Sequence, residues 1–572
     1  MLLLLAALPS ALNLPQTNPS EQLEYAPVPP DDDDVTPPSG NLSSLGLGSS
    51  SGIGAEESGG GSDSGPIEIP GGRGARPATK RCVGNPPKQT ADALAPPCVA
   101  YYAGDNGGAT YPGVTGDEIR VVVYSTGGYY SVGTSKGAEE QPTSGIIDMD
   151  KPPEGEEHTQ TRGVRALQRF FNDRFQTYNR HVHVWMYWTV DSPSAERLRA
   201  DAIDIYTKFR PFAVLPITDV DPAPMVDPLA RRGVMVIGSS AGRPASFYQK
   251  YPGLLWGYLP SIEKQAEVFA AWVCKKVVGR PVSLSGNPDE VGRPRVLGLM
   301  YTSDPRFPGL TAFGKEVKRR VEACGGTFAE ERTTPYAGLS FQADQSDDYP
   351  LQNMSAFVSA GVTTVIWAQG YETRQSQAAA QLNYRPEWFT AGDGQLEGWQ
   401  SSRYQEQSVW RYAWSVSTVV MEGPELETPC VRAVIEADPQ FGAGDAGWLC
   451  AFYPYYIDLR QLFTGVQVAG PKLTPASMDK GFRAIPRIES SSPEVPACYY
   501  DPGDYTCVKD AMAMWWDPDS EPPNDEQPGC YRAVLGGRRF IGPSPPGGDP
   551  TEQKQPGQDP CSSYIGGIRI GG

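Results

Sequence analysis

Short apolar runs alternate with amphipathic segments from residue 113 to residue 485. The β-branched run Ile119–Tyr124 predicts a strand, and apolar side chains at helical spacing over Thr161–Tyr178 predict a helix after it. The alternation continues, with strands expected at 182–190, 212–217, 234–237, 295–301, 328–331, 364–368 and 388–391, and helices at 194–209, 262–278, 309–323, 351–360, 372–382, 455–468 and 474–485. These two series predict an α/β protein with two Rossmann-like lobes, each built on a parallel sheet. Such sheets hold ligands beyond the carboxyl ends of their strands, so the predicted binding site lies between the lobes.

The flanks of this region differ from it in composition. Gly and Pro supply 63 and 56 of the 572 residues, and Ser, Gly, Pro and acidic residues dominate from Pro15 to Lys80. Such a stretch buries too little apolar surface to offset chain entropy, so we expect a disordered stalk in which the run Asp31–Asp34 is solvated. From about Ser490 a Pro-, Gly- and Cys-rich tail shows no periodicity, and we expect disulfides to staple it to the body.

Several features predict an exported protein. Met1–Leu8 resembles the apolar core of a signal peptide, and no later segment approaches the roughly 18 apolar residues of a membrane span. The number of cysteines is even, and none forms a C-x-x-C pair, which favours disulfides in an oxidising compartment over zinc ligation. Other connectivities stay open, but the predicted pairs are sequence neighbours: Cys82–Cys98, Cys274–Cys324, Cys430–Cys450, Cys498–Cys507 and Cys530–Cys561. We expect an extracellular, periplasmic or cell-surface location.

Charge and motifs exclude several functions. The formal charge of −18 leaves no broad basic surface for phosphates, so nucleic acid is not an expected partner. No Walker loop occurs, and no cofactor is predicted. His181 and His183 share one face of a predicted strand and could ligate zinc or copper, but with His158 as the only other histidine no metal site is predicted.

One motif raises the possibility of an enzyme. Residues Gly238–Gly242 satisfy G-x-S-x-G directly after an apolar strand, as in the nucleophile elbow of α/β-hydrolases. That chemistry needs an imidazole that follows the serine in the chain, whereas all three histidines precede Ser240. We therefore predict no enzyme and keep a secreted serine esterase using Ser240 as a remote alternative.

An ordered set of segments resembles the Leu/Ile/Val-type (class I) periplasmic solute-binding proteins of ABC transporters. The segments are Gly113–Ile119, Val236–Pro244, Tyr251–Tyr258, Arg293–Tyr301, Cys324–Thr327, Thr364–Gly370 and Tyr455–Leu459. The resemblance spans about residues 115 to 485. It implies a multi-strand hinge between the lobes, a small organic ligand that is amino-acid, amide or aromatic-like, and a monomer that serves an ABC permease.

By position, the resemblance also implies ligand contacts after successive strands. They are Tyr129 or Tyr130, Thr218, Asp219, Ser240, Ala241, Arg306 or Phe307, Tyr371 and Asp393. Each has a plainer interpretation, in which the hydroxyl or carboxylate side chains cap helices or close turns and the aromatic ones pack. Amino-acid binders of the family usually carry a hydroxyl where this chain has Gly242, which argues against a branched-chain amino acid.

These inferences define the expected organisation. The expected segments are a truncated signal peptide (1–14), a low-complexity linker with a Cys-containing lead-in (15–112), lobe 1 (113–257), lobe 2 (258–394), a return to lobe 1 with the hinge (395–489) and a Cys-rich extension (490–572). A different class of function stays open, in which the same two-lobed body acts as an extracellular sensor or surface protein that is not coupled to transport.

Overall fold

Six strands form the first sheet of the computed structural model, in the order β2-β3-β1-β4-β5-β6. They are β1 (Glu118–Thr126), β2 (Gly145–Asp148), β3 (His181–Thr189), β4 (Ala213–Ile217), β5 (Met235–Ile237) and β6 (Leu255–Trp256). All neighbours in the sheet are parallel except β2, which runs antiparallel to β3. The structure describes residues 82–126, 145–153, 155, 157–189, 193–218, 220–238, 243–305, 307–335, 348–368, 373–392, 399–420, 427–452, 454–521, 528–542, 544–546 and 561–562.

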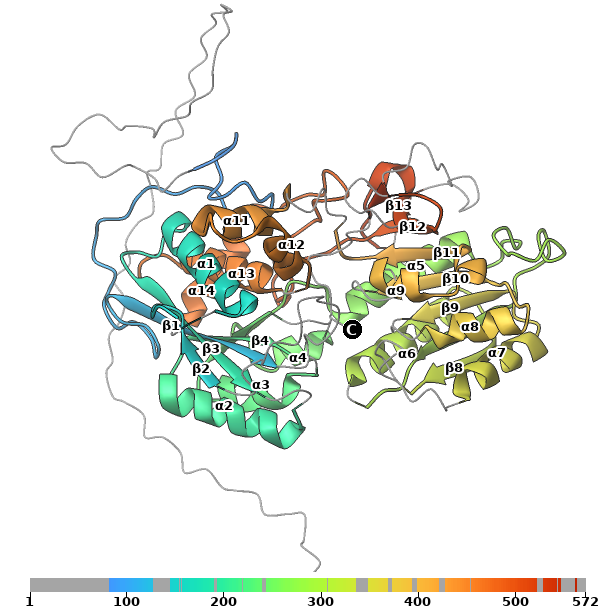
Figure 1. The fold of residues 1–572 in the computed structure, drawn as a ribbon, viewed down its shortest axis with the longest axis horizontal. Coiled ribbons are helices and arrows are strands. Elements are labelled where there is room, and N and C mark those ends of the chain that lie inside the picture. Colours follow the sequence, from blue (N-terminus) through green and yellow to red (C-terminus); the bar gives the residue numbers. More distant parts are fainter. Residues whose placement is uncertain are drawn as a thin grey trace, which may run out of the picture. The chain divides into compact units, whose positions relative to one another are not determined.

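Helices cover both faces of this sheet, as parallel sheets require, because their strands are apolar on both sides. Figure 1 shows α1 (Thr159–Arg174) and α13 (Tyr455–Ala469) on one face and α2 (Ala195–Phe209) and α3 (Ala223–Ala230) on the other. Further helices of this lobe are α4 (Ala245–Gln249), α11 (Pro429–Ala437), α12 (Ala443–Phe452) and α14 (Pro475–Ala484). We call this body the first lobe.

Eight strands form the second sheet, in the order β14-β13-β12-β11-β10-β9-β7-β8. They are β7 (Leu297–Thr302), β8 (Phe328–Thr334), β9 (Thr364–Ala368), β10 (Glu387–Gly392), β11 (Ala413–Ser417), β12 (Met512–Asp517), β13 (Cys530–Ala533) and β14 (Cys561–Ser562). Strands β7 to β11 are mutually parallel. Because β11 pairs with β10, this sheet continues past residue 394, where the second lobe was expected to end.

The second sheet is also covered on both faces. Helices α5 (Ile262–Lys276) and α6 (Pro308–Ala323) share one apolar cluster with the sheet, and α7 (Tyr349–Ser359) and α8 (Arg374–Gln381) contribute to another. Two short helices, α9 (Trp399–Tyr404) and α10 (Gln407–Trp410), precede β11. The predicted class, an α/β fold with two lobes on largely parallel sheets, is thus confirmed. None of the helices described here has the length and apolar character of a membrane span.

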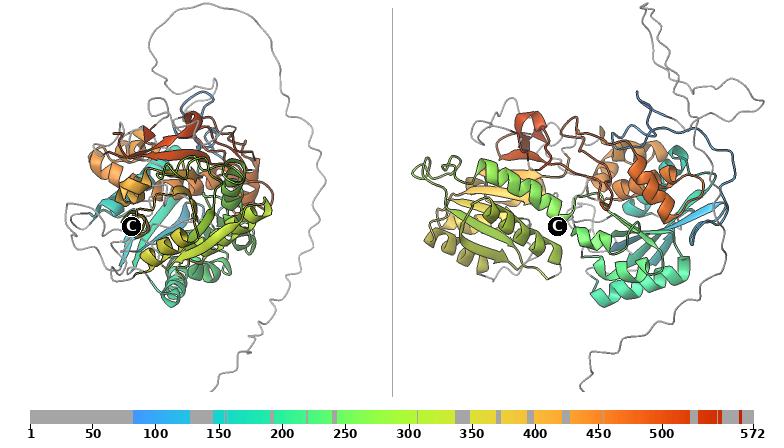
Figure 2. Two further views of the ribbon diagram at one scale, coloured as in Figure 1. Left: turned by 90° about the vertical axis from the view of Figure 1, so that its right-hand side faces the viewer. Right: turned by 180° about the vertical axis from the view of Figure 1, so that it is seen from behind.

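The C-terminal tail is more regular than the sequence predicts. Its strand β12 continues the second sheet antiparallel to β11, and β13 pairs antiparallel to β12; Figure 2 shows both strands in red and orange beside that sheet from two further sides. Met512–Asp517 is buried throughout, so it lacks the alternation that marks a half-exposed strand. Pairing with β11 satisfies the backbone groups of what would otherwise be an open sheet edge.

The lead-in before residue 113 is also ordered from Cys82, contrary to its expected place in a linker. Asp92 forms a buried ion pair with Arg460 of α13 at 2.6 Å and accepts from the Tyr456 hydroxyl at 3.0 Å. Burial alone would raise the pKa of Asp92, but Arg460 outweighs this effect and lowers it. This buried ion pair therefore attaches the lead-in to the first lobe. The composition of the lead-in gives no indication of it. The predicted signal peptide and stalk, residues 1–80, lie outside the described residues.

Four of the five predicted disulfides are present. They join Cys82 to Cys98, Cys274 to Cys324, Cys430 to Cys450 and Cys498 to Cys507. Cys530 is also disulfide-bonded, whereas the side chain of Cys561, its predicted partner, lies outside those described. Each bridge closes a local loop, as pairing between sequence neighbours predicts.

Three connections lead from one lobe to the other, and all but residues 421–426 of the second are described, which agrees with the expected multi-strand hinge. They follow β6, β11 and α14. The first and third are hydrogen-bonded to each other, since Gly257 N donates to Tyr505 O at 2.9 Å and Val508 N donates to Tyr258 O at 3.0 Å. Arg539 joins the second and third, because its guanidinium contacts the Thr418 and Val419 carbonyls and the Asp510 carboxylate. We call these three connections the hinge segments.

Candidate functional site

The carboxyl ends of β1, β3, β4 and β5 meet at one edge of the first sheet because these strands are parallel. Small polar residues or glycine stand at these ends: Ser125, Thr126, Thr189, Thr218 and Gly238. The four hydroxyl-bearing residues are at most 2% exposed. We call this row the first edge, and it is the place where a doubly wound sheet presents its ligand loops.

Side chains from the covering helices hold the first edge in place. The Tyr455 hydroxyl lies 3.2 Å from Ser125 Oγ and donates to Gln160 Oε1 at 3.2 Å. Thr189 Oγ1 donates to Asp201 Oδ2 at 3.1 Å. Helices α2 and α13 thus each supply a polar anchor to the strand ends, and α1 holds the α13 anchor through Gln160, so the loops that follow start from fixed positions.

A buried carboxyl group lies directly under the start of the loop after β5. Asp458 of α13 is 2% exposed, and its Oδ2 has no hydrogen-bond partner among the described residues. Gly238 has a φ of +93°, and a β-carbon there would overlap the Asp458 carboxyl group. Glycine is therefore required at 238 both by backbone conformation and by the close approach of Asp458. Burial raises the pKa of Asp458 well above its usual value, against the opposing charge of Arg460.

This carboxyl group should make stability depend on pH. Because the pKa of Asp458 is higher in the folded protein than in the unfolded chain, the free energy of unfolding is largest below the unfolded pKa near 4. It falls as pH rises toward the folded pKa. In the Asp458→Asn variant this loss is absent, so its stability relative to wild type should rise with pH by up to about 1.4 kcal/mol per pH unit within that window. Urea unfolding of both proteins between pH 4 and pH 8 measures this difference.

The matched control for this measurement is Asp445→Asn, because Asp445 is exposed on α12. It removes an exposed carboxylate and should change the free energy of unfolding by no more than about 0.5 kcal/mol. A difference between Asp458→Asn and wild type that does not change with pH would mean that Asp458 carries its charge in the folded protein.

The parallel strands of the second sheet form a comparable row, the second edge. Thr302, Thr334 and Ser417 end β7, β8 and β11 and are fully buried. Thr302 Oγ1 donates to the Thr334 carbonyl at 3.2 Å. By contrast, Thr334 Oγ1 and both polar atoms of the Gln375 amide are buried without a hydrogen-bond partner among the described residues. Gln375 belongs to the first turn of α8, just after the loop that follows β9.

Of the predicted ligand contacts, the structure describes Thr218 and Phe307. Thr218 follows β4 at the first edge, and its hydroxyl donates to the Val220 carbonyl, which closes its own turn. Phe307 is the N-cap of α6, after β7. The other predicted contacts lie outside the described residues: Tyr129, Tyr130, Asp219, Ser240, Ala241, Arg306, Tyr371 and Asp393. All of them stay predictions.

Asp458 and Gln375 were not predicted from the sequence. Asp458 belongs to a segment recognised only as part of the family resemblance, and Gln375 has an ordinary helical context. Nothing in their local sequence indicates that their polar atoms are buried without partners, because that property depends on tertiary packing.

The strand order also bears on the serine-esterase alternative. His181 and His183 stand at the amino end of β3, whereas Gly238, which opens the Ser240 loop, lies beyond the carboxyl end of β5. His158 caps α1 and packs edge-on against Trp188 of β3. Strands β3 and β5 are three positions apart, about 14 Å at the usual strand spacing. Direct proton transfer needs a distance near 3 Å, so His181 and His183 are not placed to pair with a residue at Gly238, whereas Ser240 itself lies outside the described residues.

Solved structures similar to this chain include solute-binding proteins of ABC transporters, at low sequence identity. No protein-family model and no curated protein match the chain. A substrate-binding protein of an ABC transporter from Aeropyrum pernix matches with a TM-score of 0.49 and 12% identity, over 75% of this chain and 97% of its own. A solute-binding protein from Rhodopseudomonas palustris in complex with 3,4-dihydroxybenzoic acid matches with a TM-score of 0.49 and 12% identity, over 76% and 99%.

A third match is a possible leucine/isoleucine/valine-binding protein from Rhodopirellula baltica, with a TM-score of 0.45, 12% identity and coverage of 73% of this chain and 96% of its own. At these scores the matches carry no argument about ligand or partner. The fold class of this chain rests on the strand order, the parallel register and the helical cover described above.

Proposed function

We propose that this chain is an exported solute-binding protein. It captures a small organic molecule, amino-acid, amide or aromatic-like, between its two lobes, closes over it through the hinge segments and delivers it to an ABC permease. It performs no chemistry on that molecule. The observation that best supports this proposal is the pair of sheet edges, one on each lobe, where buried polar groups stand at the carboxyl ends of parallel strands.

Each edge offers hydrogen-bonding groups that the described fold leaves unused. The Asp458 carboxyl group underlies the first edge, and the Gln375 amide stands by the second. A buried polar group without a partner costs about 1–3 kcal/mol. A solute, or a loop ordered by a solute, that pairs with these groups recovers that free energy. Contacts to both lobes would then favour the closed population.

Burial raises the pKa of the Asp458 carboxyl group and so favours its protonated form, which donates a hydrogen bond instead of offering a negative charge. The first edge is therefore better matched to a carbonyl or amide oxygen than to the ammonium group of an amino acid. The absence of a hydroxyl at Gly242 points in the same direction. We accordingly rank small amides and uncharged aromatic solutes above branched-chain amino acids and other free carboxylates.

A ligand screen tests this function. The full-length chain, with its disulfides intact, is tested by thermal shift against leucine, small amides, ureas and hydroxybenzoates. A solute at a hundred times its dissociation constant should stabilise the protein by about 2.7 kcal/mol. Small-angle scattering with the same solute should show a smaller radius of gyration, as closure requires. Asp393→Ala should weaken the shift, whereas Asp445→Ala, an exposed carboxylate on α12, should not.

Two outcomes would contradict the proposal. One is ester cleavage that disappears in Ser240→Ala, which would establish the hydrolase. The other is a solute that stabilises the chain equally in wild type and Asp393→Ala and leaves the radius of gyration unchanged, which would mean binding outside the lobe interface. Tight binding of leucine that depends on Asp393 would keep the receptor function and overturn only the ranking of solutes.

A further inference from the structure

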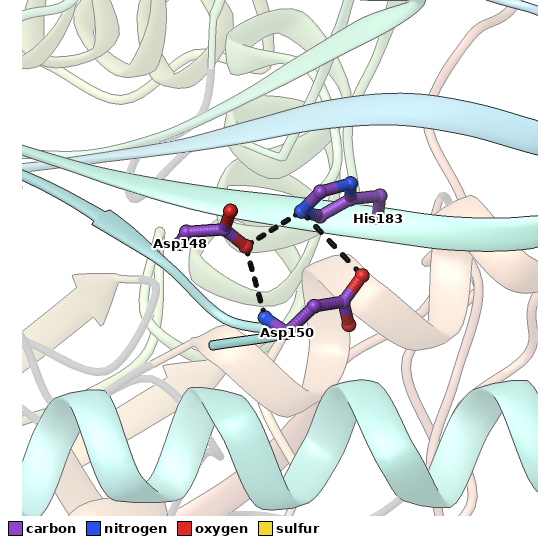
Figure 3. A group of neighbouring side chains, drawn as sticks. All are labelled: Asp148, Asp150 and His183. Carbon is purple, nitrogen blue, oxygen red and sulfur yellow. Dashed lines mark hydrogen bonds and ion pairs between the residues drawn. The ribbon is translucent and has the colours of Figure 1, made fainter. Parts of the chain in front are cut away.

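Two carboxylates and an imidazole converge at the opposite edge of the first sheet. His183 Nε2 lies 2.7 Å from Asp148 Oδ1 and 3.4 Å from Asp150 Oδ2. Figure 3 shows both carboxylates turned toward this single nitrogen. One potential ligand atom from each of the three residues lies within 4.8 Å of the others. These distances match a group able to surround one cation.

Strand pairing explains why these residues meet. Strand β2 runs antiparallel to β3 and ends at Asp148, which pairs with Trp185 in the middle of β3, so the turn after β2 lies beside the first half of β3. His181 and His183 are two residues apart on β3 and therefore face the same side of the sheet. Asp150 follows in the turn after β2, where its N–H donates to Asp148 Oδ1 at 3.0 Å, and its carboxylate lies 2.9 Å from His181 Nε2. The spacing of the two histidines can be seen in the sequence. The approach of Asp148 and Asp150 to them depends on the antiparallel pairing of β2 with β3.

The imidazole of His183 is already oriented. Its Nδ1 lies 2.8 Å from Glu118 Oε1, and its ring stacks on Trp185 with centroids 3.6 Å apart. A carboxylate on one ring nitrogen is the usual support for a histidine that binds metal through the other. His183 Nε2 is therefore the nitrogen directed toward Asp148 and Asp150.

We propose that Asp148, Asp150, His181 and His183 bind one divalent first-row transition-metal ion, with Zn²⁺ as the best match. Two imidazoles with two carboxylates are ligands that Zn²⁺ accepts at about 2.0–2.2 Å, whereas Ca²⁺ and Mg²⁺ prefer oxygen ligands alone. In this site the ion replaces the direct contact between His183 and Asp148, and Glu118 keeps its hydrogen bond to Nδ1. His181 is 46% exposed and Asp150 35% exposed, so the ion can enter from solvent.

This site is separate from the proposed solute site. It lies at the amino end of β3, and the first edge lies at the carboxyl end of the same strand. The nine residues of β3 place the two ends about 25–30 Å apart at the usual rise per residue. The metal therefore stabilises the edge of the first lobe and does not contact the solute.

Calorimetry tests the site on the full-length chain, purified without a polyhistidine tag and stripped with a chelator. Titration with ZnCl₂ at pH 7 should show one ion per chain with an affinity in the micromolar range or tighter. His183→Ala and Asp148→Asn should each weaken binding at least about 100-fold, and Glu118→Ala about 10- to 100-fold. His158→Ala is the matched control, because this histidine caps α1 away from the cluster, and it should bind as wild type does.

A second readout guards against variants that fail to fold. Co²⁺ added to the stripped wild-type chain should give a visible absorption band that Zn²⁺ displaces, and circular dichroism should show every variant folded. Zn²⁺ binding weaker than millimolar, or unchanged in folded His183→Ala, would overturn the proposal. The cluster would then be a histidine held by carboxylates and nothing more. Preference for Ca²⁺ over Zn²⁺ would also contradict it, because it would exclude the imidazoles as ligands.

Discussion

Replacing Glu387 by alanine is expected to destabilise the second lobe by about 3–5 kcal/mol. Glu387 opens β10 and is fully buried. Its carboxylate accepts from Arg295 at 2.7 and 2.9 Å, from the N–H groups of Ser283 and Leu284 at 2.8 and 2.7 Å, and from Thr364 Oγ1 at 2.6 Å. One side chain thus joins β9 and β10 to the segment that leads from α5 into β7.

The size of this effect follows from the buried groups that lose their partner when Glu387 is replaced. The Arg295 side chain is 2% exposed, so without Glu387 its positive charge faces the Ser283 hydroxyl, two backbone carbonyls and the Phe389 ring in place of a carboxylate. Breaking a buried pair from one side costs far more than the pair contributes, because the remaining charge keeps its full desolvation cost. The N–H groups of Ser283 and Leu284 also lose their acceptor in this variant, which further lowers the free energy of unfolding.

Urea unfolding followed by tryptophan fluorescence measures the effect. Glu322→Ala is the matched control, since its carboxylate is 49% exposed and lies 3.9 Å from Lys318, and a change within about 1 kcal/mol is expected. The double variant Arg295→Met/Glu387→Leu removes both charges and should be less destabilised than Glu387→Ala. A loss below about 1 kcal/mol for Glu387→Ala would mean that water reaches Arg295 in the folded protein.

The sequence predicts most elements of both sheets because parallel strands and their helices carry strong local signals. Strand β9 runs over Thr364–Ala368, as predicted, and α13 begins at Tyr455, the residue predicted. The elements that were missed have weak or conflicting signals. Met512–Asp517 is apolar on both faces in a Pro- and Gly-rich setting, and β2 has four residues, which is too short for a pattern to stand out.

The candidate site is harder to predict because its chemistry depends on packing between distant segments. Asp92 and Arg460 are 368 residues apart, and neither has a local sequence signal for a buried pair. Asp458 is buried with a raised pKa because α13 lies under the turn at Gly238. The two histidines on β3 could be identified from their spacing, but their carboxylate neighbours come from a strand that pairs antiparallel to them. Local patterns therefore predict the strands and helices, whereas contacts between distant segments decide which polar groups are buried and which groups they meet.

Replacing Arg539 by alanine is expected to cost about 3–5 kcal/mol and to loosen the hinge. The Arg539 side chain is fully buried and its partner Asp510 is 1% exposed. Its guanidinium donates to Asp510 Oδ1 at 2.9 Å and to the carbonyls of Thr418 and Val419 at 2.9 and 2.8 Å. Since Thr418 follows β11 and Asp510 precedes β12, this one side chain holds two hinge segments together where they leave the second sheet.

The alanine variant removes the guanidinium from the Asp510 carboxyl group and from the Thr418 and Val419 carbonyls, and the buried carboxyl group keeps the hydrogen bond from the Ala497 N–H. Burial raises the pKa of Asp510, and Arg539 and the Ala497 N–H oppose this effect, so removal of the arginine shifts the carboxyl group toward its protonated form. The stability loss in Arg539→Ala should therefore be smaller at pH 4 than at pH 8. Asp510→Asn, which keeps the shape of the side chain, separates the charge from the packing.

Arg538→Ala is the matched control for this experiment. It changes the neighbouring arginine, which is exposed, and should alter the free energy of unfolding by no more than about 0.5 kcal/mol. Hydrogen exchange adds a local readout, because amides of residues 418–420 and 505–511 should lose protection in Arg539→Ala before those of β3 or β9. Equal exchange in all four segments would mean that Arg539 stabilises the whole protein without a specific effect on the hinge. A hinge effect would instead appear as a faster and less cooperative closure over solute, since the two connections would then move independently.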